Sequence, residues 1–458
     1  MPGVRVVDMS FVPLLPEPYP PPGDIVPLSF LDTRWIHLQQ PVQDLLLYPD
    51  STLSSSSLHL CKTSLTQALS FFQPLAGKLT YWHATDQLVI DSSSPDCGVS
   101  VIEAESDLDI HRLINEETID IKAFTKLVPS FSMDELPVPT FAIQITKFVG
   151  GGVSVGTALH HTAMDGIGFW RFMETWAAIC RDNGVPFRSH LQTSHDRDVI
   201  LDPQKEQIAR QFMRLLAPGL PQLPQVPKSL LQDRLQLTRR TFTLDNTTIQ
   251  FLKRRACTQC DNQTTFTPSA SIAIAAHVWV SLAKAKRLPK ENDATSLWLL
   301  VDLRAYLKGS KNDVLFTGNC IRGVTVKSTG QDLTAPEGLA NACVAISRAV
   351  KAVRERPLDG VERWPEEFKN RPTGMNVMVA GSARWGAYEI DFGWGRPGRV
   401  ELVSMNLDGE VSMFSGREKG SVQATVALAG EQMEVFTKAF IAGLAQQGQS
   451  DYHGMARL

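Results

Sequence analysis

The chain has 458 residues, of which 43% are hydrophobic and 20% charged, an ordinary composition for a soluble globular protein with a substantial core. Its 45 Lys and Arg residues against 48 Asp and Glu residues give a net charge of −3, which leaves no basic excess for binding a nucleic-acid backbone. The 28 prolines and 31 glycines argue for many loops and against a coiled coil or solenoid.

Neither a membrane span nor a secretion signal is visible in the sequence. Prolines interrupt the apolar N-terminal segment, and the longest apolar stretch, 272–283, is well short of the ~20 residues that cross a bilayer. The seven cysteines are scattered and odd in number, which predicts free thiols in a reducing compartment. Cys257 and Cys260 form a lone CxxC pair with no second pair to complete a zinc site, so we expect no bound metal.

The first part of the chain mixes helices with strands. Apolar residues recur at helical spacing from Leu58 to Phe72. Two alternating apolar segments, 141–149 and 153–159, flank a run of glycines and predict a hairpin. The second strand runs directly into the sequence HHTAMDG, and the spacing of apolar residues predicts an amphipathic helix from Phe169 to Cys180.

The composition then changes. From Asp182 to about Lys228 the hydrophobic periodicity is poor, and prolines recur at every third position from 218 to 227. Such a segment is typical of a semi-rigid extended linker. We therefore predict an N-terminal domain over 1–182, a crossover linker over 183–228 and a C-terminal domain over 229–458.

The second half repeats the mixture of helices and strands without a visible sequence repeat. The expected elements are a buried helix at 269–285, a buried strand at 295–303, a helix from Leu339 to Val353, a hairpin at 411–426 and a last helix at about 431–446. Two similar-sized halves of this kind predict an α/β protein with two mixed-sheet domains.

The strongest local feature is His161-x-x-x-Asp165-Gly166, at the predicted junction between a strand and a helix. A strand end can project an imidazole into a cleft between domains, and a histidine with a nearly neutral pKa suits removal of a proton from a hydroxyl or amine. Asp165 can orient this imidazole or anchor the turn through a cation elsewhere. On the motif alone, a turn histidine beside a helix-capping aspartate is an equal alternative.

Several other chemistries lack their motifs. No serine lies in G-x-S-x-G, so a nucleophile elbow is absent. The dinucleotide motif G-x-G-x-x-G and the P-loop are absent as well. His161 and Asp165 have the spacing of half a zinc site, but no second His or Cys cluster completes it.

A second motif, Asp391-Phe392-Gly393-Trp394-Gly395, lies 230 residues downstream of His161. In this order and at this distance, HTAMDG and DFGWG resemble the BAHD family of plant CoA-dependent acyltransferases. The resemblance extends over nearly the whole chain, through PLSFLD (27–32), PLAGKL (74–79), VDLRAYL (301–307) and TGNC (317–320). It implies two domains with a chloramphenicol-acetyltransferase-like fold.

Finer features resemble one branch of that family. HDRDVILDP (195–203) and FTGNC (316–320) look like the branch that acylates anthocyanins and other phenolic glycosides, many of whose members use malonyl-CoA. That branch usually has YFGNC where this chain has LFTGNC, and the segment IGFWRF (167–172) is bulkier than expected. Malonyl and hydroxycinnamoyl groups therefore both stay open.

The resemblance also implies roles for individual residues. His161 corresponds to the general base that takes the proton from the acceptor hydroxyl, which attacks the thioester directly without an acyl-enzyme. Asp165 corresponds to a residue that turns away from the reaction and pairs with an arginine, for which Arg304 is the candidate. Asp391 to Gly395 corresponds to a structural loop away from the chemistry.

Acyl-CoA is implied as co-substrate, in a tunnel between the two halves, with no permanently bound cofactor. Lys253, Arg254 and Arg255 are candidates to bind the CoA phosphates, although a basic run on a helix is also typical of a solvated face. Arg171 is either a contact for a malonyl carboxylate or an exposed helical arginine.

The sequence thus predicts an acyl-CoA-dependent O-acyltransferase that acts on a hydroxyl of a phenolic glycoside such as a flavonoid or anthocyanin glucoside. The alternatives are an N-acyltransferase that makes hydroxycinnamic acid amides and a catalytically silent paralogue that binds CoA. We expect a cytoplasmic monomer. The ending Ala456-Arg457-Leu458 is close to the Ser-Lys-Leu peroxisomal address, which makes the peroxisome the alternative location.

Overall fold

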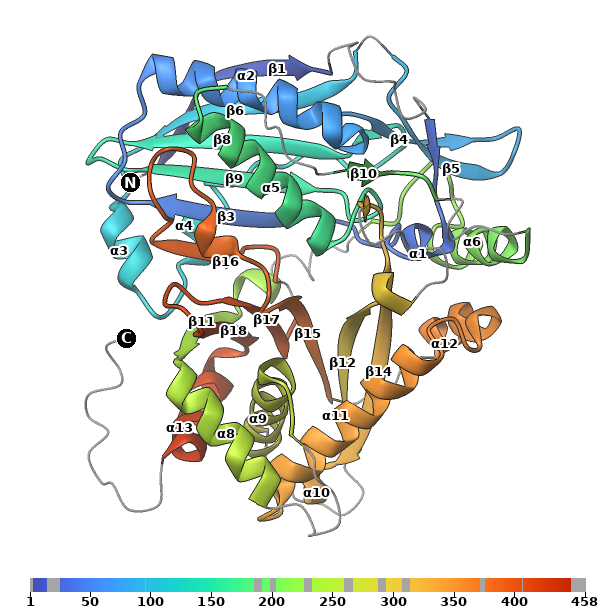
Figure 1. Ribbon diagram of the computed structural model, residues 1–458, viewed down its shortest axis with the longest axis vertical. Helices are drawn as coiled ribbons and strands as arrows, with labels where there is room; N and C mark the ends of the chain where they lie inside the picture. The colour runs from blue at the N-terminus through green and yellow to red at the C-terminus, as the bar shows by residue number, and fades with distance from the viewer. Residues whose placement is uncertain are drawn as a thin grey trace.

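The computed structural model describes residues 3–14, 25–94, 96–184, 192–197, 203–225, 233–258, 267–286, 294–306, 314–370, 375–405 and 407–445. Two six-stranded mixed sheets, each with helices packed on it, form its two halves (Figure 1). This arrangement confirms the α/β class and the two mixed-sheet domains expected from the sequence. In the described part of the chain, every helix is too short or too polar to cross a bilayer.

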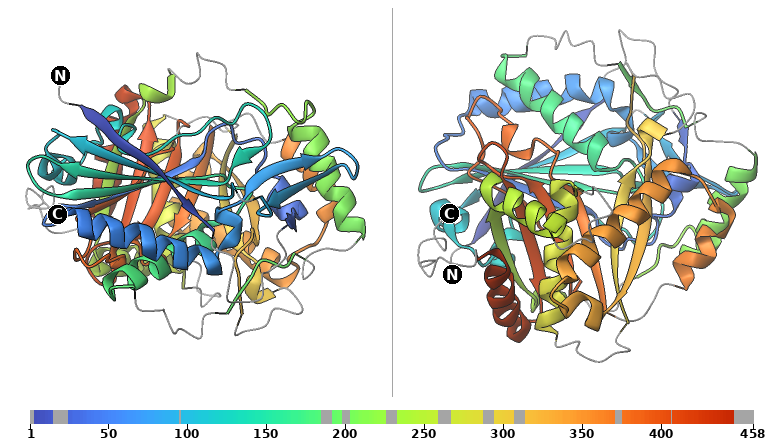
Figure 2. Two further views of the ribbon diagram at one scale, coloured as in Figure 1. Left: turned by 90° about the horizontal axis from the view of Figure 1, so that it is seen from above. Right: turned by 60° about the horizontal axis from the view of Figure 1, so that its bottom comes forward.

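The N-terminal sheet has the strand order β1-β6-β8-β9-β3-β16. Only β6 and β8 pair in parallel, and all the other neighbours are antiparallel. Figure 2 shows α2 (Ser55–Phe71) and α5 (Gly166–Arg181) together on one face of this sheet. The strands are β1 (Val4–Pro13), β3 (Val42–Tyr48), β6 (Gly98–Ser106), β8 (Phe141–Phe148), β9 (Val153–Leu159) and β16 (Arg399–Leu402).

Both faces of the N-terminal sheet are covered. In β3, Leu46 and Tyr48 pack into the cluster that contains α2 and α5, whereas Leu45 and Leu47 pack against α3 (Ile110–Asn115) and α4 (Ile121–Phe124). Because side chains alternate between the two faces of a strand, double coverage requires a nearly continuous apolar run. The same reason explains why every residue of β9 is buried.

A smaller antiparallel sheet flanks this half, with the order β2-β5-β4-β7. Its strands are β2 (Ile25–Pro27), β4 (Lys78–Trp82), β5 (Gln87–Asp91) and β7 (Val138–Pro139). The short helix α1 (Phe30–Thr33) follows β2 directly, and all four of its residues are buried.

The segment 183–228 differs from the extended linker expected from its sequence. It contains an amphipathic helix, α6 (Pro203–Leu216), which packs on α1. Ile208 and Phe212 are buried in the same apolar cluster as Phe30 of α1. The proline repeat begins only after this helix, so it indicates the helix end rather than the conformation of the whole segment. The domain boundaries at 182 and 228 stay predictions.

The C-terminal sheet has the order β11-β18-β17-β15-β12-β14. Helix α9 is almost entirely buried, because α8, α11, α13 and the sheet surround it. A helix that is apolar on all sides is expected in such a position. The strands are β11 (Thr238–Leu244), β12 (Ala294–Asp302), β14 (Ile321–Thr329), β15 (Met375–Ser382), β17 (Glu410–Ser415) and β18 (Val422–Leu428), and the helices are α8 (Asn246–Thr258), α9 (Ala270–Ala285), α10 (Gly330–Thr334), α11 (Gly338–Glu355), α12 (Trp364–Lys369) and α13 (Gly430–Leu444).

One strand pairing joins the two halves, and a second joins the segment between them to the C-terminal half. β16 comes from the C-terminal half of the chain but pairs with β3, so it forms the edge of the N-terminal sheet (Figure 1). In addition, β10 (Gln192–Ser194) pairs in parallel with β13 (Val314–Phe316).

β16 also carries a buried ion pair. Arg399 Nε donates to Glu401 Oε1 at 2.9 Å, and these side chains are only 6% and 1% exposed. Arg399 Nη1 donates to the carbonyl of Leu113, and Glu401 accepts from the hydroxyls of Thr241 and Thr425. The pair therefore joins the N-terminal sheet to β11 and β18 of the C-terminal sheet.

Replacing Arg399 with Met should lower the free energy of unfolding by about 3–5 kcal/mol, because Glu401 would be left as a buried charge without its cation. Urea denaturation followed by circular dichroism measures this change. Arg5→Met is the matched control, since Arg5 pairs with Glu105 on the surface, where the two side chains are 74% and 41% exposed. Its expected effect is below about 1 kcal/mol. Equal effects of the two substitutions would contradict the role given to the Arg399–Glu401 pair.

Candidate active site

The turn between β9 and α5 carries the first motif. β9 ends at Leu159, and α5 begins at Gly166 with Asp165 as its N-cap. Asp165 Oδ1 accepts from the backbone amides of Ile167 and Gly168 at 3.1 and 3.2 Å. A side chain at position 166 would collide with the ring of Trp385, which explains why the motif has a glycine there. The turn thus places His161 just beyond the strand end, as the sequence analysis expected.

Asp165 forms a bidentate ion pair with Arg304. Arg304 Nη1 donates to Oδ2 and Nη2 donates to Oδ1, both at 2.9 Å. Oδ2 also accepts from the amide of Cys320 at 2.9 Å. Burial alone would lower the pKa of Arg304. The charge and hydrogen bonds of Asp165 raise it by more than burial lowers it, so the pKa lies well above its ordinary value. The pairing expected for these two residues is confirmed, and both oxygens of Asp165 are engaged away from the imidazole.

A second buried ion pair lies beside the first and was missed by the sequence analysis. Asp32, which is fully buried, accepts from Arg197 Nε at 3.3 Å, with both side chains 0% exposed. The guanidinium of Arg197 also donates hydrogen bonds to the carbonyls of His195 and Ala163. Asp32 directly follows the apolar residues Phe30 and Leu31 and precedes Trp35 and Ile36. That position predicts burial, and a buried carboxylate requires a partner.

Asn319 links Asp32 to His161. Its backbone amide and Nδ2 both donate to Asp32 Oδ1 at 3.0 Å, and Nδ2 also donates to the carbonyl of His161 at 2.8 Å. Arg304 Nη2 donates to the carbonyl of the neighbouring Gly318 at 2.9 Å. Residues of the segments PLSFLD, HTAMDG, HDR (195–197), VDLR and TGNC therefore meet in one buried hydrogen-bonded cluster around the turn.

Two adjacent histidines in the turn have different environments. His160 is fully buried, its Nδ1 contacts the hydroxyl of Thr162 at 2.7 Å, and burial lowers its pKa to about 3. His161 is only half-buried, and its ring stacks on Trp35. Burial also lowers the pKa of His161, so its imidazole is neutral at pH 7. His161, and not His160, combines a neutral ring with access to solvent.

The DFGWG segment forms a tight turn around Asp391. Asp391 Oδ1 accepts from the amides of Gly393 and Gly395, both at 2.8 Å. These glycines have φ of +93° and +80°, which disfavours any side chain there. Phe392 packs on Trp176 with ring centroids 4.7 Å apart.

Trp176 lies ten residues along α5 from Gly166, which is about 15 Å at 1.5 Å per residue. This position fits the structural role that the family resemblance implied for the DFGWG loop.

The three basic CoA candidates differ in their surroundings. On α8, Arg254 is exposed, while Lys253 and Arg255 are half-buried. Arg255 Nη1 donates to the carbonyl of Gly443 in α13 and lines a hollow of about 200 Å³ with Lys284. Their role in CoA binding stays a prediction.

Of the two roles considered for Arg171, the structure shows an exposed helical arginine. Its side chain is 51% exposed and pairs with Glu174 at 2.8 Å. This pair lies within one turn of α5, at the i, i+3 spacing.

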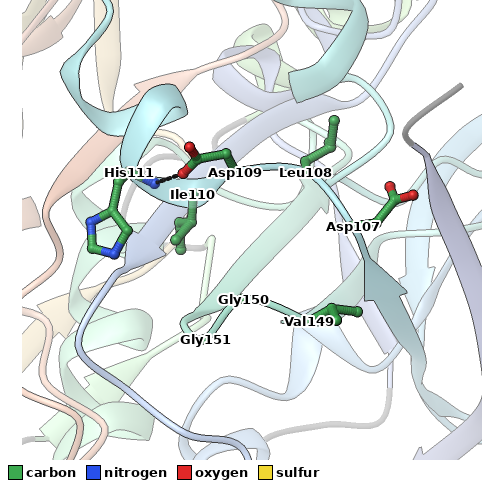
Figure 3. Close-up of a pocket in the computed structure, with 8 residues that line it drawn as sticks. All are labelled: Asp107, Leu108, Asp109, Ile110, His111, Val149, Gly150 and Gly151. Atoms are coloured by element: carbon green, nitrogen blue, oxygen red, sulfur yellow. Dashed lines mark hydrogen bonds between the residues drawn. The ribbon is translucent and has the colours of Figure 1, made fainter.

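A larger hollow, of about 370 Å³, lies at the opposite end of the N-terminal sheet (Figure 3). It is lined by the turn 149–151 before β9 and by residues 107–111, where Asp109 caps α3 through the amide of His111. Seven residues of β9 separate this turn from the end of the strand, roughly 24 Å at 3.4 Å per residue. The hollow is therefore distant from His161.

No group of three His, Cys, Asp or Glu side chains that could hold a metal ion occurs in the described ranges. Cys257 lies in the last turn of α8, while Cys260, the other member of the CxxC pair, lies outside those ranges. The C-terminal Ala456-Arg457-Leu458 lies outside them as well.

The sequence matches one protein family and several acyltransferases over most of its length. The family model of the Transferase family matches residues 18–442. Phenolic glucoside malonyltransferase 2 of Arabidopsis thaliana is 29% identical over 434 residues, covering 92% of this chain and 94% of that protein. The malonyl-coenzyme:anthocyanin 5-O-glucoside-6'''-O-malonyltransferase of Salvia splendens is 29% identical, with 93% of each chain covered. Agmatine coumaroyltransferase of Arabidopsis thaliana is 28% identical, with 91% and 94% covered.

Solved structures show the same fold at lower identity. Vinorine synthase aligns with a TM-score of 0.71 and 18% identity, covering 96% of this chain and 98% of that chain. TRI101 of F. graminearum, complexed with coenzyme A and T-2 mycotoxin, aligns with a TM-score of 0.69 and 16% identity, covering 90% and 96%.

The half-buried position of His161 predicts the pH dependence of turnover. Because burial lowers the pKa of His161 from 6.5, the neutral ring should persist below pH 6.5. We expect kcat/KM to fall on the acid side with an apparent pKa below 6.5. Initial rates between pH 4.5 and 9 measure this limb. An acid limb centred above pH 6.5 would contradict the environment described for the imidazole.

The Asp165–Arg304 pair should show energetic coupling. In a double-mutant cycle of Asp165→Asn and Arg304→Ala, we expect a coupling of about 0.5–3 kcal/mol in the free energy of unfolding, because the two side chains share buried hydrogen bonds. The cycle of Glu174→Ala and Arg171→Ala on the exposed face of α5 is the control, with an expected coupling of about 0.2–0.5 kcal/mol. Strict additivity at Asp165 and Arg304 would remove the pair as the anchor of the turn.

Proposed function

Since the chain belongs to the Transferase family, that of the BAHD acyltransferases, and is an acyl-CoA-dependent acyltransferase, we propose that it transfers an acyl group from CoA to a hydroxyl of a phenolic glycoside. The observation that carries the proposal is the turn between β9 and α5. It presents one half-buried, neutral histidine, His161, beside a carboxylate, Asp165, that is fully engaged elsewhere.

In the proposed reaction, His161 acts as general base. It takes the proton of the acceptor hydroxyl while the oxygen attacks the thioester carbonyl. The tetrahedral intermediate then collapses, the ester forms, and the C–S bond breaks to release CoA thiolate, which receives the proton back from the imidazolium. Because the acceptor attacks directly, the reaction requires no acyl-enzyme and no nucleophilic Ser or Cys.

A neutral imidazole is the form that can accept a proton, and the lowered pKa of His161 supplies it at pH 7. Asp165 contributes by holding the turn through Arg304 rather than by bonding to the ring. This division of work differs from a Ser-His-Asp triad, in which the aspartate bonds directly to the histidine.

The acyl group that we propose is malonyl or hydroxycinnamoyl. Relatives whose names state malonyl transfer to phenolic or anthocyanin glucosides support the first, and a relative named as a coumaroyltransferase of anthocyanidin 3-O-glucoside supports the second. Arg171, considered from the sequence as a contact for a malonyl carboxylate, is exposed and paired with Glu174. The malonyl proposal therefore rests on the relatives and not on Arg171.

N-acylation is the second candidate function. Agmatine coumaroyltransferase, at 28% identity, is named for an amine acceptor. The same base would serve, since an amine also loses a proton when it attacks the thioester. Under either function, we propose acyl-CoA as a dissociable co-substrate, no permanently bound cofactor, a monomeric state and a cytoplasmic location.

Replacing His161 with Ala should lower kcat by about 10²–10⁴-fold, because the reaction would lose its general base, while the Kd for CoA stays nearly unchanged. The measurement first needs the substrates, which a mass-spectrometric screen supplies. It combines malonyl-, coumaroyl-, caffeoyl- and acetyl-CoA with a mixture of phenolic glucosides and a mixture of amines. His59→Ala is the control, since His59 is exposed on α2.

Each outcome of this experiment decides between the functions. Acylated glucosides support O-acylation, and acylated amines alone would replace it with N-acylation. Tight CoA binding without any product would favour a catalytically silent paralogue. Wild-type kcat in the His161→Ala variant would overturn the mechanism.

A further inference from the structure

Trp35 lies face to face with His161. The ring centroids are 3.9 Å apart, and the ring planes differ by only 15°. The indole covers one face of the imidazole, so a substrate can approach the ring only from its edge or its other face. Trp35 itself is 7% exposed, which means that protein encloses the rest of the indole.

Several contacts fix the position of Trp35. Its backbone amide donates to the carbonyl of Asp32 at 3.1 Å, which ties it to the buried Asp32–Arg197 pair. Trp298 of β12 meets the indole edge-on, with centroids 6.5 Å apart, and the guanidinium of Arg34 lies 5.0 Å from the ring centre. The indole is therefore held from both halves of the chain.

Stacking is what holds the two rings together. Trp35 Nε1 is buried, and within the described part of the chain it has no hydrogen-bond partner. Replacing the indole by another flat ring would consequently break no hydrogen bond, whereas replacing it by an aliphatic side chain would remove the flat surface under His161.

We propose that Trp35 is a positioning residue for the acyl transfer: its indole sets the plane of the His161 imidazole and keeps water from one face of it. The proposal deepens the proposed function, because it takes His161 as the general base. A ring fixed in its plane keeps its basic nitrogen aimed at the acceptor, and a misplacement of about 1 Å in such a site can lower the rate by about 10²-fold.

The same stack affects the protonation of His161. Burial is the largest influence on its pKa and lowers it, and the positive charge of Arg34 acts in the same direction. Asp165, the side chain of Asn319 and the carbonyl of His161 itself act in the opposite direction. Removing the indole would admit water, so the pKa should rise towards its ordinary value of 6.5.

The test compares Trp35→Leu, Trp35→Phe and a control, Trp364→Leu. Trp364 is 6% exposed and lies under the guanidinium of Arg322, so it matches Trp35 in burial and in its cation contact but belongs to α12. Measurements are kcat and KM over pH, Tm, and the pKa of His161 from NMR of histidine-labelled protein. The His161→Ala spectrum assigns the resonance.

For Trp35→Leu we expect kcat to fall by about 10–100-fold, with KM for the donor within about threefold. The pKa of His161, in the NMR titration and in the acid limb, should rise towards 6.5. Trp35→Phe should keep most of the wild-type kcat, because it keeps a flat ring. Its pKa for His161 should lie between those of the wild type and Trp35→Leu. Trp364→Leu should lower Tm without changing kcat or the pKa.

A loss of Tm with kcat and the pKa of His161 unchanged would show that Trp35 is only a core side chain, which overturns the proposal. If Trp35→Leu does not fold, Trp35→Phe decides, since its smaller ring should still shift the pKa upwards and no shift would overturn the proposal. The NMR titration needs no substrate. A failure of the proposed function, seen as wild-type turnover in His161→Ala, is therefore distinguishable from a failure of the role given to Trp35.

Discussion

The bidentate contact between Asp165 and Arg304 is the interaction on which the site depends most. It joins the N-cap of α5 to a residue just beyond the end of β12, 139 positions away in sequence, and it takes up both oxygens of the only carboxylate in the His161 turn. A buried ion pair of this kind adds little net stability compared with apolar packing, but breaking it is strongly unfavourable. Its contribution is therefore to select one arrangement of the two halves around the turn.

The second buried pair, Asp32–Arg197, extends this constraint to the N-terminal segment. Arg197 donates to the carbonyl of Ala163, and Asn319, itself bound to Asp32, donates to the carbonyl of His161. Carbonyls on both sides of Thr162 are thus held by side chains from distant segments. The backbone that carries the imidazole is fixed from several directions, which is how a short turn can hold a proton acceptor in a defined orientation.

The local patterns were sufficient to predict the hairpin, α5 and the position of His161, whereas the pairing of Asp165 with Arg304 was expected from the family resemblance. Periodicity reveals elements whose own residues contact the core, and a motif reveals a turn whose geometry is set within a few residues. The pairing of β16 with β3, the Asp32–Arg197 pair and the stack of Trp35 on His161 join residues far apart in sequence, so no window of the sequence contains them. Helix α6 was missed because the expectation for the whole segment rested on the prolines that follow it, although Ile208, Ala209, Phe212 and Met213 recur at helical spacing.

The strand exchanged between the halves has a consequence for motion. β16 is hydrogen-bonded along β3, and its Glu401 accepts from Thr241 and Thr425 of the C-terminal sheet, so moving the two halves apart would break either this ladder or these buried hydrogen bonds. Enzymes that close two domains over a substrate use hinges that cross few such bonds. A strand shared in this way therefore opposes a hinge motion that would separate the two sheets.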